Sequence, residues 1–380
     1  MGIDACHTRT AVSRRTVLAS AVALTTGGLA ACAGTERAAP VAPTVSEPTP
    51  QGPHQPGILT PPPAAAMVTA VELRATDRAG LTGALRAITE IVATADDVEV
   101  TVAVGGSLFD HRFGLAAVRP RRLSAMPSFP NDALEPALCH GDLLVQAGGP
   151  DAASVTAVTE RVTAAAGRRR WQVSGAHRDR AETVTGRHTE RNLFGFREGA
   201  GNPDVTDAAE MDRVLWAGPD EPAWTAGGTY QVIRLIRFAT QLWAAEPTAR
   251  QEAIFGRTRD GDVPLGHRYE TDQIDYGTDQ GGRLIPLDAH IRRANPRTAD
   301  TADSAMLRRG FTYDRGPADQ GLVFVCFQQD LERSFATVQR RLTGAALDRY
   351  VLPVGGGYFF ALPGVSADPA DHLGRGLVTT

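Results

Sequence analysis

The chain has 380 residues, a formal net charge of −4 and hydrophobic residues at 42% of its positions. This length is sufficient for two units with sizeable cores, or for one large duplicated unit. The 39 basic residues are all arginine and are interspersed with 43 acidic ones. No long basic run of the kind that predicts nucleic-acid binding occurs after the N-terminus. We therefore expect a small-molecule partner and no nucleic acid.

Residues 1–31 have the pattern of an export signal. Arg14 and Arg15, within Ser13–Leu18, precede an apolar run that is too short to span a bilayer permanently and ends in small residues. The paired arginines resemble a twin-arginine signal, which a receptor reads and which carries proteins that have already folded. We therefore expect an extracytoplasmic protein that is exported after it has folded and acquired any cofactor.

The end of this signal also resembles a bacterial lipobox. In Leu29-Ala30-Ala31-Cys32, the thiol of Cys32 would be acylated and this residue would become the new N-terminus. Two or more acyl chains anchor a protein stably to the cell membrane. The alternative is an ordinary cleaved signal in which the cysteine is accidental. Residues 32–50 follow as a Pro/Ala-rich linker, because this composition does not bury a core.

Two cysteines, Cys139 and Cys326, remain in the part of the chain that is expected to fold. Both lie beside apolar stretches and far apart in sequence, which predicts buried, inert thiols rather than a disulfide framework. His140 follows Cys139 directly, but adjacent side chains rarely converge on one metal ion. We therefore expect no structural zinc.

Short strands alternate with helices along the remaining chain. The hydrophobic periodicity predicts strands at 67–73, 98–104, 142–147, 229–238 and 322–327, and helices at 81–92, 152–166 and 331–342. Two similar arrays in tandem predict an α+β fold. We expect two ferredoxin-like units of the dimeric α+β barrel type, with antiparallel sheets and peripheral helices, at 51–220 and 221–380. The segment 255–309 has few strand or helix signals, and so long a connection is usually functional.

Three segments carry a resemblance to one family. They are FGFREGAGNP at 194–203, DAHIRRANPR at 288–297 and MLRRGFTYD at 306–314. Together they resemble the dye-decolourising (Dyp-type) haem peroxidases, in particular the exported, twin-arginine type related to deferrochelatases. Supporting stretches are HQPGI at 54–58, PSFPNDAL at 127–134, CHGDLLVQ at 139–146, GGTYQVIRLIRF at 227–238 and PVGGGYFF at 353–360. The resemblance covers nearly the whole chain after the linker.

The resemblance implies one haem b per chain, with His290 as the axial ligand of the haem iron. A neutral imidazole suits this role, and its second ring nitrogen needs an acceptor, for which Asp279 and Asp288 are candidates. By the same resemblance Glu198 moves the proton of hydrogen peroxide and Arg308 supplies a fixed positive charge. Glu198 departs from the family, which usually has Asp here; the alternative is a surface turn residue.

Other residues are assigned to the haem by the same comparison. Gly199, Ala200 and Gly201 are expected to line its plane, and Asn295, Pro296 and Arg297 to lie against the macrocycle or its carboxylates, for which Arg is a good bidentate partner. Arg234 and Arg237 lie three residues apart on a predicted strand, so that at most one can point inward. Surface aromatic residues could relay electrons, and the candidates are Trp171, Trp216, Trp224, Trp243 and Tyr313.

The leading functional hypothesis is a haem peroxidase that reduces hydrogen peroxide and oxidises bulky phenolic or dye-like reductants outside the cytoplasmic membrane. The alternative is a haem-handling or ferrous-iron-oxidising component of an iron-uptake system, related to deferrochelatase, which Glu198 slightly favours. A third hypothesis is a lipoprotein that uses this scaffold only to bind a partner. Iron-uptake proteins and a second copy of the chain are further candidate partners.

Overall fold

The computed structural model describes residues 52–178, 181–182 and 188–380. The predicted signal, the lipobox with Cys32 and the linker at 32–50 lie outside these residues. Within the described ranges, no helix is both long and apolar enough to cross a membrane.

The first half of the described chain is a ferredoxin-like unit. In chain order it contains β1 (Ala65–Leu73), α1 (Arg78–Ala93), β2 (Glu99–Gly105), β3 (Leu143–Gly149), α2 (Ala152–Ala166) and β4 (Gly167–Ala176). The strands are antiparallel in the order β2-β3-β1-β4. Asp77 is the N-cap of α1, and its carboxylate accepts the Gly80 N–H at 2.7 Å. Such a cap satisfies a backbone N–H that has no partner within the first turn of the helix.

The second half repeats this topology. Its main elements are β7 (Thr229–Phe238), β9 (Phe311–Asp314), β10 (Gln320–Gln328), α7 (Thr337–Leu342) and β11 (Val351–Ala361). The strand order β9-β10-β7-β11 corresponds to that of the first half. A two-residue strand, β8 (Leu307–Arg308), pairs with β10 as well. The other elements are β5 (Ala181–Glu182), β6 (His188–Thr189), α3 (Ala208–Val214), α4 (Thr240–Ala244), α5 (Thr248–Phe255), α6 (His290–Ala294) and α8 (Arg375–Thr379).

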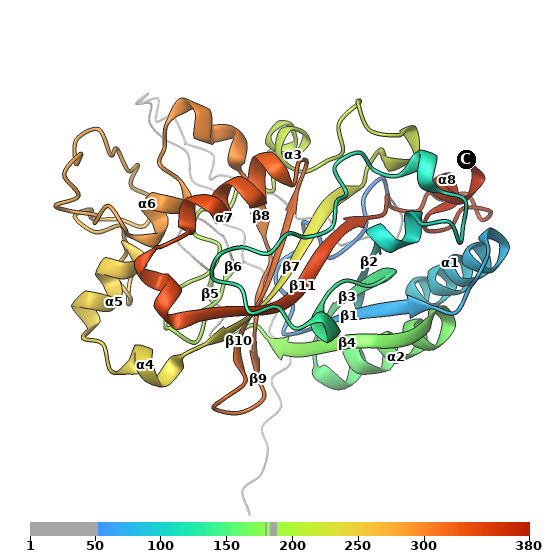
Figure 1. Cartoon of the computed structure of the whole chain (residues 1–380), viewed down its shortest axis with the longest axis horizontal. Coiled ribbons are helices and arrows are strands. Elements are labelled where there is room, and N and C mark those ends of the chain that lie inside the picture. The colour runs from blue at the N-terminus through green and yellow to red at the C-terminus, as the bar shows by residue number, and fades with distance from the viewer. Residues whose placement is uncertain (1–51, 179–180, 183–187) are drawn as a thin grey trace, which may run out of the picture. The chain divides into compact units, whose positions relative to one another are not determined.

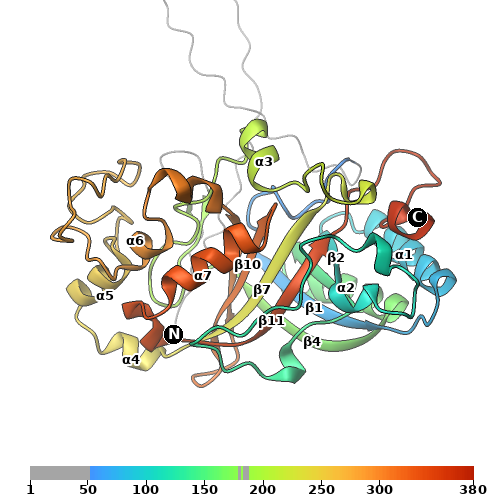
Figure 2. The same ribbon diagram turned by 45° about the horizontal axis from the view of Figure 1, so that its top comes forward.

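The two units share one closed barrel. Strand β11 pairs with β2, β4 meets β9 at Ala176 and Thr312, and the pairing of β7 with β10 completes the ring. Helices α1 and α2 lie beside the strands of the first unit, whereas α4 to α7 lie beside those of the second (Figures 1 and 2). This arrangement confirms the predicted α+β fold with tandem ferredoxin-like units.

The predicted helix at 331–342 differs from the structure in its first half. Residues Glu332–Ala336 form a π-helix, and only Thr337–Leu342 is α-helical. The Thr337 hydroxyl donates to the Glu332 carbonyl at 2.7 Å, five residues earlier, which supports the wider turn. Apolar spacing cannot distinguish such a turn from an α-helix, because both bury one stripe of side chains.

The arginines of β7 lie on opposite faces, as predicted. Arg234 is 1% exposed and pairs with the buried Asp132, whereas Arg237 is partly exposed and pairs with Glu135 and Asp319. Asp132 and Glu135 belong to the segment 119–139, which crosses the barrel over β7 and β11 (Figure 1). Arg234 therefore fastens this segment to the barrel.

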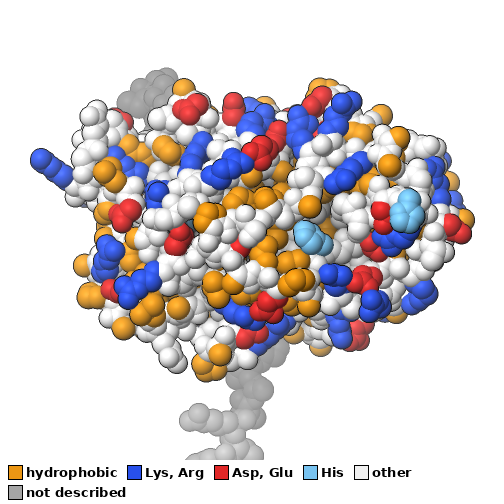
Figure 3. Space-filling model, in the orientation of Figure 1, with side chains coloured by type: hydrophobic (Ala, Val, Ile, Leu, Met, Phe, Trp, Pro, Cys, Tyr) orange, Lys and Arg blue, Asp and Glu red, His pale blue; other side chains and the backbone are white. Residues whose placement is uncertain are grey.

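The other expectations for the folded part can be compared directly with the structure. Cys139 and Cys326 are both free and buried, as predicted. Among the described residues, no group of His, Cys, Asp or Glu side chains is arranged to hold a metal ion. On the face drawn in Figure 3, arginines alternate with acidic side chains, and hydrophobic side chains gather near its centre.

Candidate active site

The loop that carries Glu198 is a tight hairpin built around Asn192. Its strands meet at Arg191 and Arg197, and the Glu198 N–H donates to the Glu190 carbonyl at 2.8 Å. Gly195 has a φ of +87°, which allows the turn. The Asn192 side chain accepts the N–H groups of residues 194 and 196 at 2.9 and 3.3 Å. Asn192 thus holds the backbone that presents Glu198.

The Glu198 carboxylate lies inside the protein and not on a surface turn. Asn192 donates to its Oε1 at 2.7 Å. Burial raises the pKa of Glu198, whereas this hydrogen bond and the charge of Arg308 lower it. Protonation of this carboxyl group is therefore easier than that of an exposed glutamate, which favours a role in proton transfer.

Arg308 is positioned by Asn202. The Asn202 Oδ1 accepts the backbone N–H and the Nε–H of Arg308 at 3.0 and 3.1 Å, and its Nδ2 donates to the Arg308 carbonyl at 2.9 Å. A Cβ added at Gly201 would lie 3.3 Å from Arg308 Nη2, so that a glycine leaves room for the guanidinium. Gly199 has a φ of +82° in the same loop. The glycine-rich segment and strand β8 therefore fit together through Asn202 and Gly201.

His290 is the first residue of α6. Its ring lies 5.9 Å from the ring of Phe255, measured between centroids. Burial, followed by the charge of Arg308, lowers the pKa of His290 to about 4. The imidazole is therefore neutral at physiological pH, which is the form that binds a metal. No residue in the described part of the chain forms a hydrogen bond with this ring.

Glu198 and His290 both lie near Arg308. The charge of Arg308 acts on both of the other groups, lowering the pKa of each. Burial is the largest cause of the pKa shift of all three, yet each retains some accessible surface. The structure therefore brings together the three residues that the resemblance assigned to catalysis.

Asp279 and Asp288 do not accept a hydrogen bond from the second ring nitrogen of His290, which was the role expected of one of them. The Asp279 carboxylate accepts the backbone N–H groups of Arg283 and Ile285 at 2.7 and 3.0 Å and pairs with Arg292 at 3.1 Å. Asp288 is exposed. Within the described chain neither is hydrogen-bonded to His290. Asp279 instead shapes the turn that precedes α6, because its oxygens are used by the loop itself.

Residues 295–297 follow α6 directly. Asn295 ends the helix, and its Oδ1 accepts the Arg297 N–H at 3.0 Å. Arg297 has a φ of +57°, which is uncommon for a residue other than glycine. Asn295 and Arg297 are exposed and Pro296 is partly buried. Arg297 is thus held in an unusual conformation by its own loop; its contact with haem stays a prediction.

The expected surface position of the five candidate aromatic residues is wrong, because all of them are buried; their role as electron relays stays a prediction. Their exposed fractions are 4% for Trp171, 7% for Trp216, 8% for Trp224, 3% for Trp243 and 3% for Tyr313. Trp243 is joined to His290 through Phe255, since the ring centroids are 5.7 Å apart from Trp243 to Phe255 and 5.9 Å from Phe255 to His290. Of the five, Trp243 is therefore the one with an aromatic path to the site.

Two residues that hold the site were not found from the sequence. Asn192 and Asn202 contact Glu198 and Arg308, respectively, but no sequence pattern predicted a role for either. Asn202 lies in the motif at 194–203 and Asn192 two residues before it. Their position in or beside a motif with special backbone turns was the available signal, because Asn side chains frequently hydrogen-bond nearby backbone groups.

Comparison with known proteins identifies the class that this fold and site define. Residues 55–175 match the family model of the N-terminal part of Dyp-type peroxidases, and residues 189–366 match that of the C-terminal part. Two related proteins are 42–43% identical to this chain over 86% of its length. The chain therefore belongs to the Dyp-type peroxidases, which makes it an oxidoreductase that acts on hydrogen peroxide.

Two of the similar proteins are named deferrochelatase, and two similar solved structures come from Streptomyces. Deferrochelatase of Shigella flexneri is 43% identical over 365 residues, which is 86% of each chain, and Deferrochelatase of Escherichia coli strain K12 is 42% identical over the same length and shares. A crystal structure of a DyP-type peroxidase from Streptomyces coelicolor is 31% identical with a TM-score of 0.80, covering 88% of this chain and 97% of the other. Ferric DtpA from Streptomyces lividans is also 31% identical, with a TM-score of 0.79 and the same coverage.

Haem is the cofactor of this class, and the residues present fit it. His290 offers a neutral imidazole that has no hydrogen-bond partner among the described residues and retains some accessible surface. Such an imidazole is a usual axial ligand of haem iron. Gly201 allows the Arg308 guanidinium to approach the glycine-rich loop closely. The chain thus provides a candidate ligand and a carboxyl–guanidinium pair near it.

Proposed function

We propose that this protein uses hydrogen peroxide to oxidise bulky phenolic or dye-like reductants outside the cytoplasmic membrane. The observation that carries the proposal is that the charge of Arg308 acts on both Glu198 and His290, so that the three side chains lie near one another. When bound there, haem iron supplies the redox centre for peroxide reduction. His290 is proposed as its axial ligand, with Gly199, Ala200 and Gly201 against the haem plane and Asn295, Pro296 and Arg297 near its edge or carboxylates.

Glu198 is proposed to accept one proton of hydrogen peroxide and to return it to the departing oxygen. Its ionised form is the acceptor, and Asn192 fixes the carboxylate by holding Oε1. Arg308 keeps its positive charge and stabilises negative charge that develops on the peroxide oxygens. The two side chains do not form an ion pair with each other, so that the guanidinium remains available to the substrate.

Changing Asn192 to Asp is expected to raise the pKa of Glu198. Aspartate retains the oxygen that accepts the two loop N–H groups but loses the N–H that stabilises ionised Glu198. A hydrogen bond to a charged group contributes about 1.5–3 kcal/mol, and one pKa unit is about 1.4 kcal/mol, so a rise of about 1–2 units follows. The reaction requires the ionised carboxylate. On acidification the variant should therefore lose its reaction with peroxide at a higher pH than the wild type does. Stopped-flow rates between acid and neutral pH measure this shift; an unchanged acid limb contradicts it.

A haem-handling role in iron uptake is the second candidate. The observation that favours it is the similarity to relatives named deferrochelatase. In this role the same site would hold haem while iron is removed, or the protein would oxidise ferrous iron, together with iron-uptake partners.

One assay distinguishes the two candidates. Purified, haem-loaded protein is given hydrogen peroxide and a bulky anthraquinone dye, and dye bleaching and the fluorescence of iron-free porphyrin are followed in parallel. Bleaching that depends on Glu198 without porphyrin release supports the leading proposal. Porphyrin release without bleaching overturns it in favour of the second candidate.

Export by the twin-arginine route and a lipid anchor at Cys32 are part of the proposal. The pattern of residues 1–32 supports them, since a folded, haem-loaded protein needs a route that accepts folded cargo. The linker at 32–50 would hold the enzyme away from the membrane.

Export and anchoring can be separated by substitution. Arg14→Lys combined with Arg15→Lys should leave haem-loaded precursor in the cytoplasm, because the receptor reads the paired arginines. Cys32→Ala should instead release a soluble extracytoplasmic form. Cell fractionation with immunoblotting measures both; Cys32→Ala protein that still sediments with membranes would show that the lipid anchor is wrong.

A further inference from the structure

A second glutamate, Glu190, lies opposite Glu198 in the same hairpin. Glu190 is 3% exposed, and because Arg191 pairs with Arg197 in an antiparallel bridge, residues 190 and 198 are opposite each other. Side chains at opposite positions of an antiparallel pair point to the same face, with Cβ atoms about 4.5–5.5 Å apart. The two carboxyl groups are therefore neighbours by construction of the hairpin.

Glu190 has the properties of a neutral acid. Its Oε2 accepts the Arg178 N–H at 3.1 Å, whereas its Oε1 is buried and has no hydrogen-bond partner among the described residues. Burial and then the charge of Glu198 raise the pKa of Glu190 to about 9, against the opposing effects of the Arg178 N–H and the charge of Arg309. Two adjacent carboxyl groups resist a second negative charge. At neutral pH Glu190 therefore holds a proton beside Glu198.

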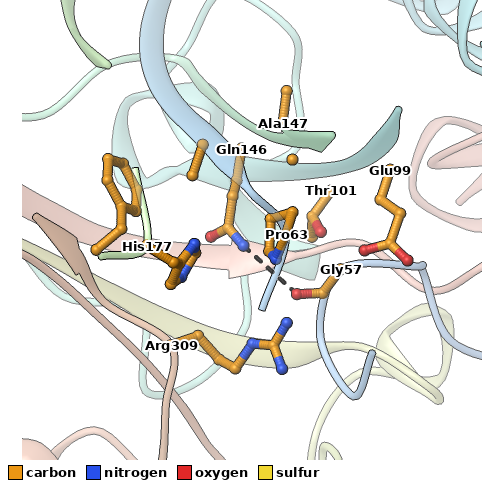
Figure 4. A pocket seen from close by; sticks show the side chains of 11 residues that line it. Gly57, Pro63, Glu99, Thr101, Gln146, Ala147, His177 and Arg309 are labelled. Atoms are coloured by element: carbon orange, nitrogen blue, oxygen red, sulfur yellow. Dashed lines mark hydrogen bonds between the residues drawn. The ribbon is translucent and has the colours of Figure 1, made fainter. Parts of the chain in front are cut away.

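His177 connects Glu190 to a small cavity. The Glu190 Oε1 lies 4.0 Å from His177 Nε2, and His177 lines a cavity of about 20 Å³ together with Arg309 and Glu99. In Figure 4 these three side chains surround the same space, with the Arg309 guanidinium between the other two in this view. This volume has room for about one water, which needs roughly 10–15 Å³ and two to four polar partners. The cavity is thus suited to water and too small for an organic reductant.

Charged groups surround this path from several elements. Glu198 faces Glu190 across the hairpin. The charge of Arg309, in the segment after β8, lowers the pKa of Glu190 and also that of Glu99 in β2. Thr60 donates to Glu99 at 2.6 Å near the outer end. Glu99 and Arg309 retain accessible surface. The path therefore runs from partly accessible side chains, through His177 and Glu190, to Glu198.

Peroxide reduction creates a demand for protons at the site. Hydrogen peroxide accepts two electrons and two protons to give two waters, and the electrons come from two phenolic molecules that each lose one electron and one proton. A bulky reductant that does not enter the protein releases its proton to solvent, so the two protons must reach the buried site separately. Glu198 can move a proton between oxygens but needs a source to be reprotonated.

We propose that Glu190 and His177 form a proton relay that supplies Glu198 from the water-sized cavity beside Arg309. In each relay step Glu190 passes its proton to ionised Glu198, Glu198 passes it to an oxygen derived from peroxide, and Glu190 is reprotonated through His177, which takes a proton from water in the cavity. Two such steps supply the two protons that one hydrogen peroxide consumes. Each proton is matched by one electron from the reductant, so no net charge accumulates. Both residues are positioning residues that act through Glu198. The inference rests on the role proposed above for Glu198.

Glu190→Gln is a sharp test, because glutamine has the shape and neutral charge of the protonated acid but cannot pass on a proton. A merely structural Glu190 would leave turnover at neutral pH unchanged. The relay predicts slower steady-state turnover, by up to about 10²-fold, the lower end of the effect of a positioned proton-transfer group, with a larger solvent deuterium isotope effect. Glu190→Asp should retain part of the activity. His177→Gln should resemble Glu190→Gln, and the double variant should be no slower than either single variant, because both lie on one path.

Asp262→Asn is the matched control. Asp262 is also a buried carboxylic acid whose pKa is raised, to about 7, in part by the charge of Glu198, but it does not line the cavity. The isotope effect should not change in this variant. An infrared titration of the resting protein gives a readout independent of turnover: the band of a protonated carboxylic acid that disappears near pH 9 should be absent from Glu190→Gln.

The outcomes separate the relay from the role of Glu198. If Glu198→Gln slows the peroxide reaction while Glu190→Gln and His177→Gln have wild-type turnover and isotope effects, the relay is wrong and the role of Glu198 stands. If Glu198→Gln has no effect, the proposed role of Glu198 is wrong, and the relay has no acceptor. If the infrared spectrum of Glu190→Gln matches that of wild type, Glu190 is not the proton store and the relay is overturned.

Discussion

His290→Ala is expected to abolish stable haem binding. His290 offers a neutral imidazole near Arg308, whereas the remaining contacts to haem would come only from apolar groups and from partners of the carboxylates. The Soret absorbance of the purified variant should be lost, and free imidazole should restore part of it by occupying the space that the side chain leaves.

His111→Ala provides the control for this result, because His111 is exposed and lies in the first unit. Its Soret spectrum should equal that of wild type. Circular dichroism of the His290→Ala apoprotein checks that the fold is intact. An unchanged spectrum of His-ligated haem in His290→Ala would disprove the assignment of the ligand.

Glu198→Gln is expected to slow the reaction with hydrogen peroxide by about 10²–10⁴-fold, the usual range for general acid–base catalysis. Glutamine nearly preserves the shape of Glu198 and can still accept from Asn192, so the loss reports the missing proton acceptor. Glu198→Asp restores the residue that the resembled family usually has and should keep or raise the rate. The rate constant comes from stopped-flow absorbance of the haem-loaded protein.

Arg308→Leu tests the alternative in which the arginine alone drives peroxide cleavage. A fixed cation that stabilises developing negative charge contributes a comparable factor, so we expect this variant to be slow as well. Glu160→Gln, an exposed position on α2, is the control and should react at the wild-type rate. Wild-type rates in Glu198→Gln together with an inactive Arg308→Leu would make the carboxylate a bystander.

Local patterns in the sequence were sufficient for the main elements of the fold. The period of apolar residues predicted α2 at 152–166 and β7 at 229–238 with the bounds that the structure has, because burying one face of a strand or helix imposes that period on the sequence. The motifs likewise identified Glu198, Arg308 and His290, since a resemblance retains residue types in a fixed order. No single motif determines the distances between these three residues.

Tertiary structure decided what depends on residues that are far apart in the sequence. The barrel closes through pairings such as Ala176 with Thr312, which no local period predicts. Asn202 reaches Arg308 across 106 positions, and Asp279 satisfies its own loop instead of His290, because a carboxylate bonds to the donors that the folded backbone places nearest. The neighbouring positions of Glu190 and Glu198 likewise follow from the register of the hairpin. The sequence by itself thus determined which chemical groups are present, whereas the folded chain determined which of them meet, because burial and charge act between neighbours in space.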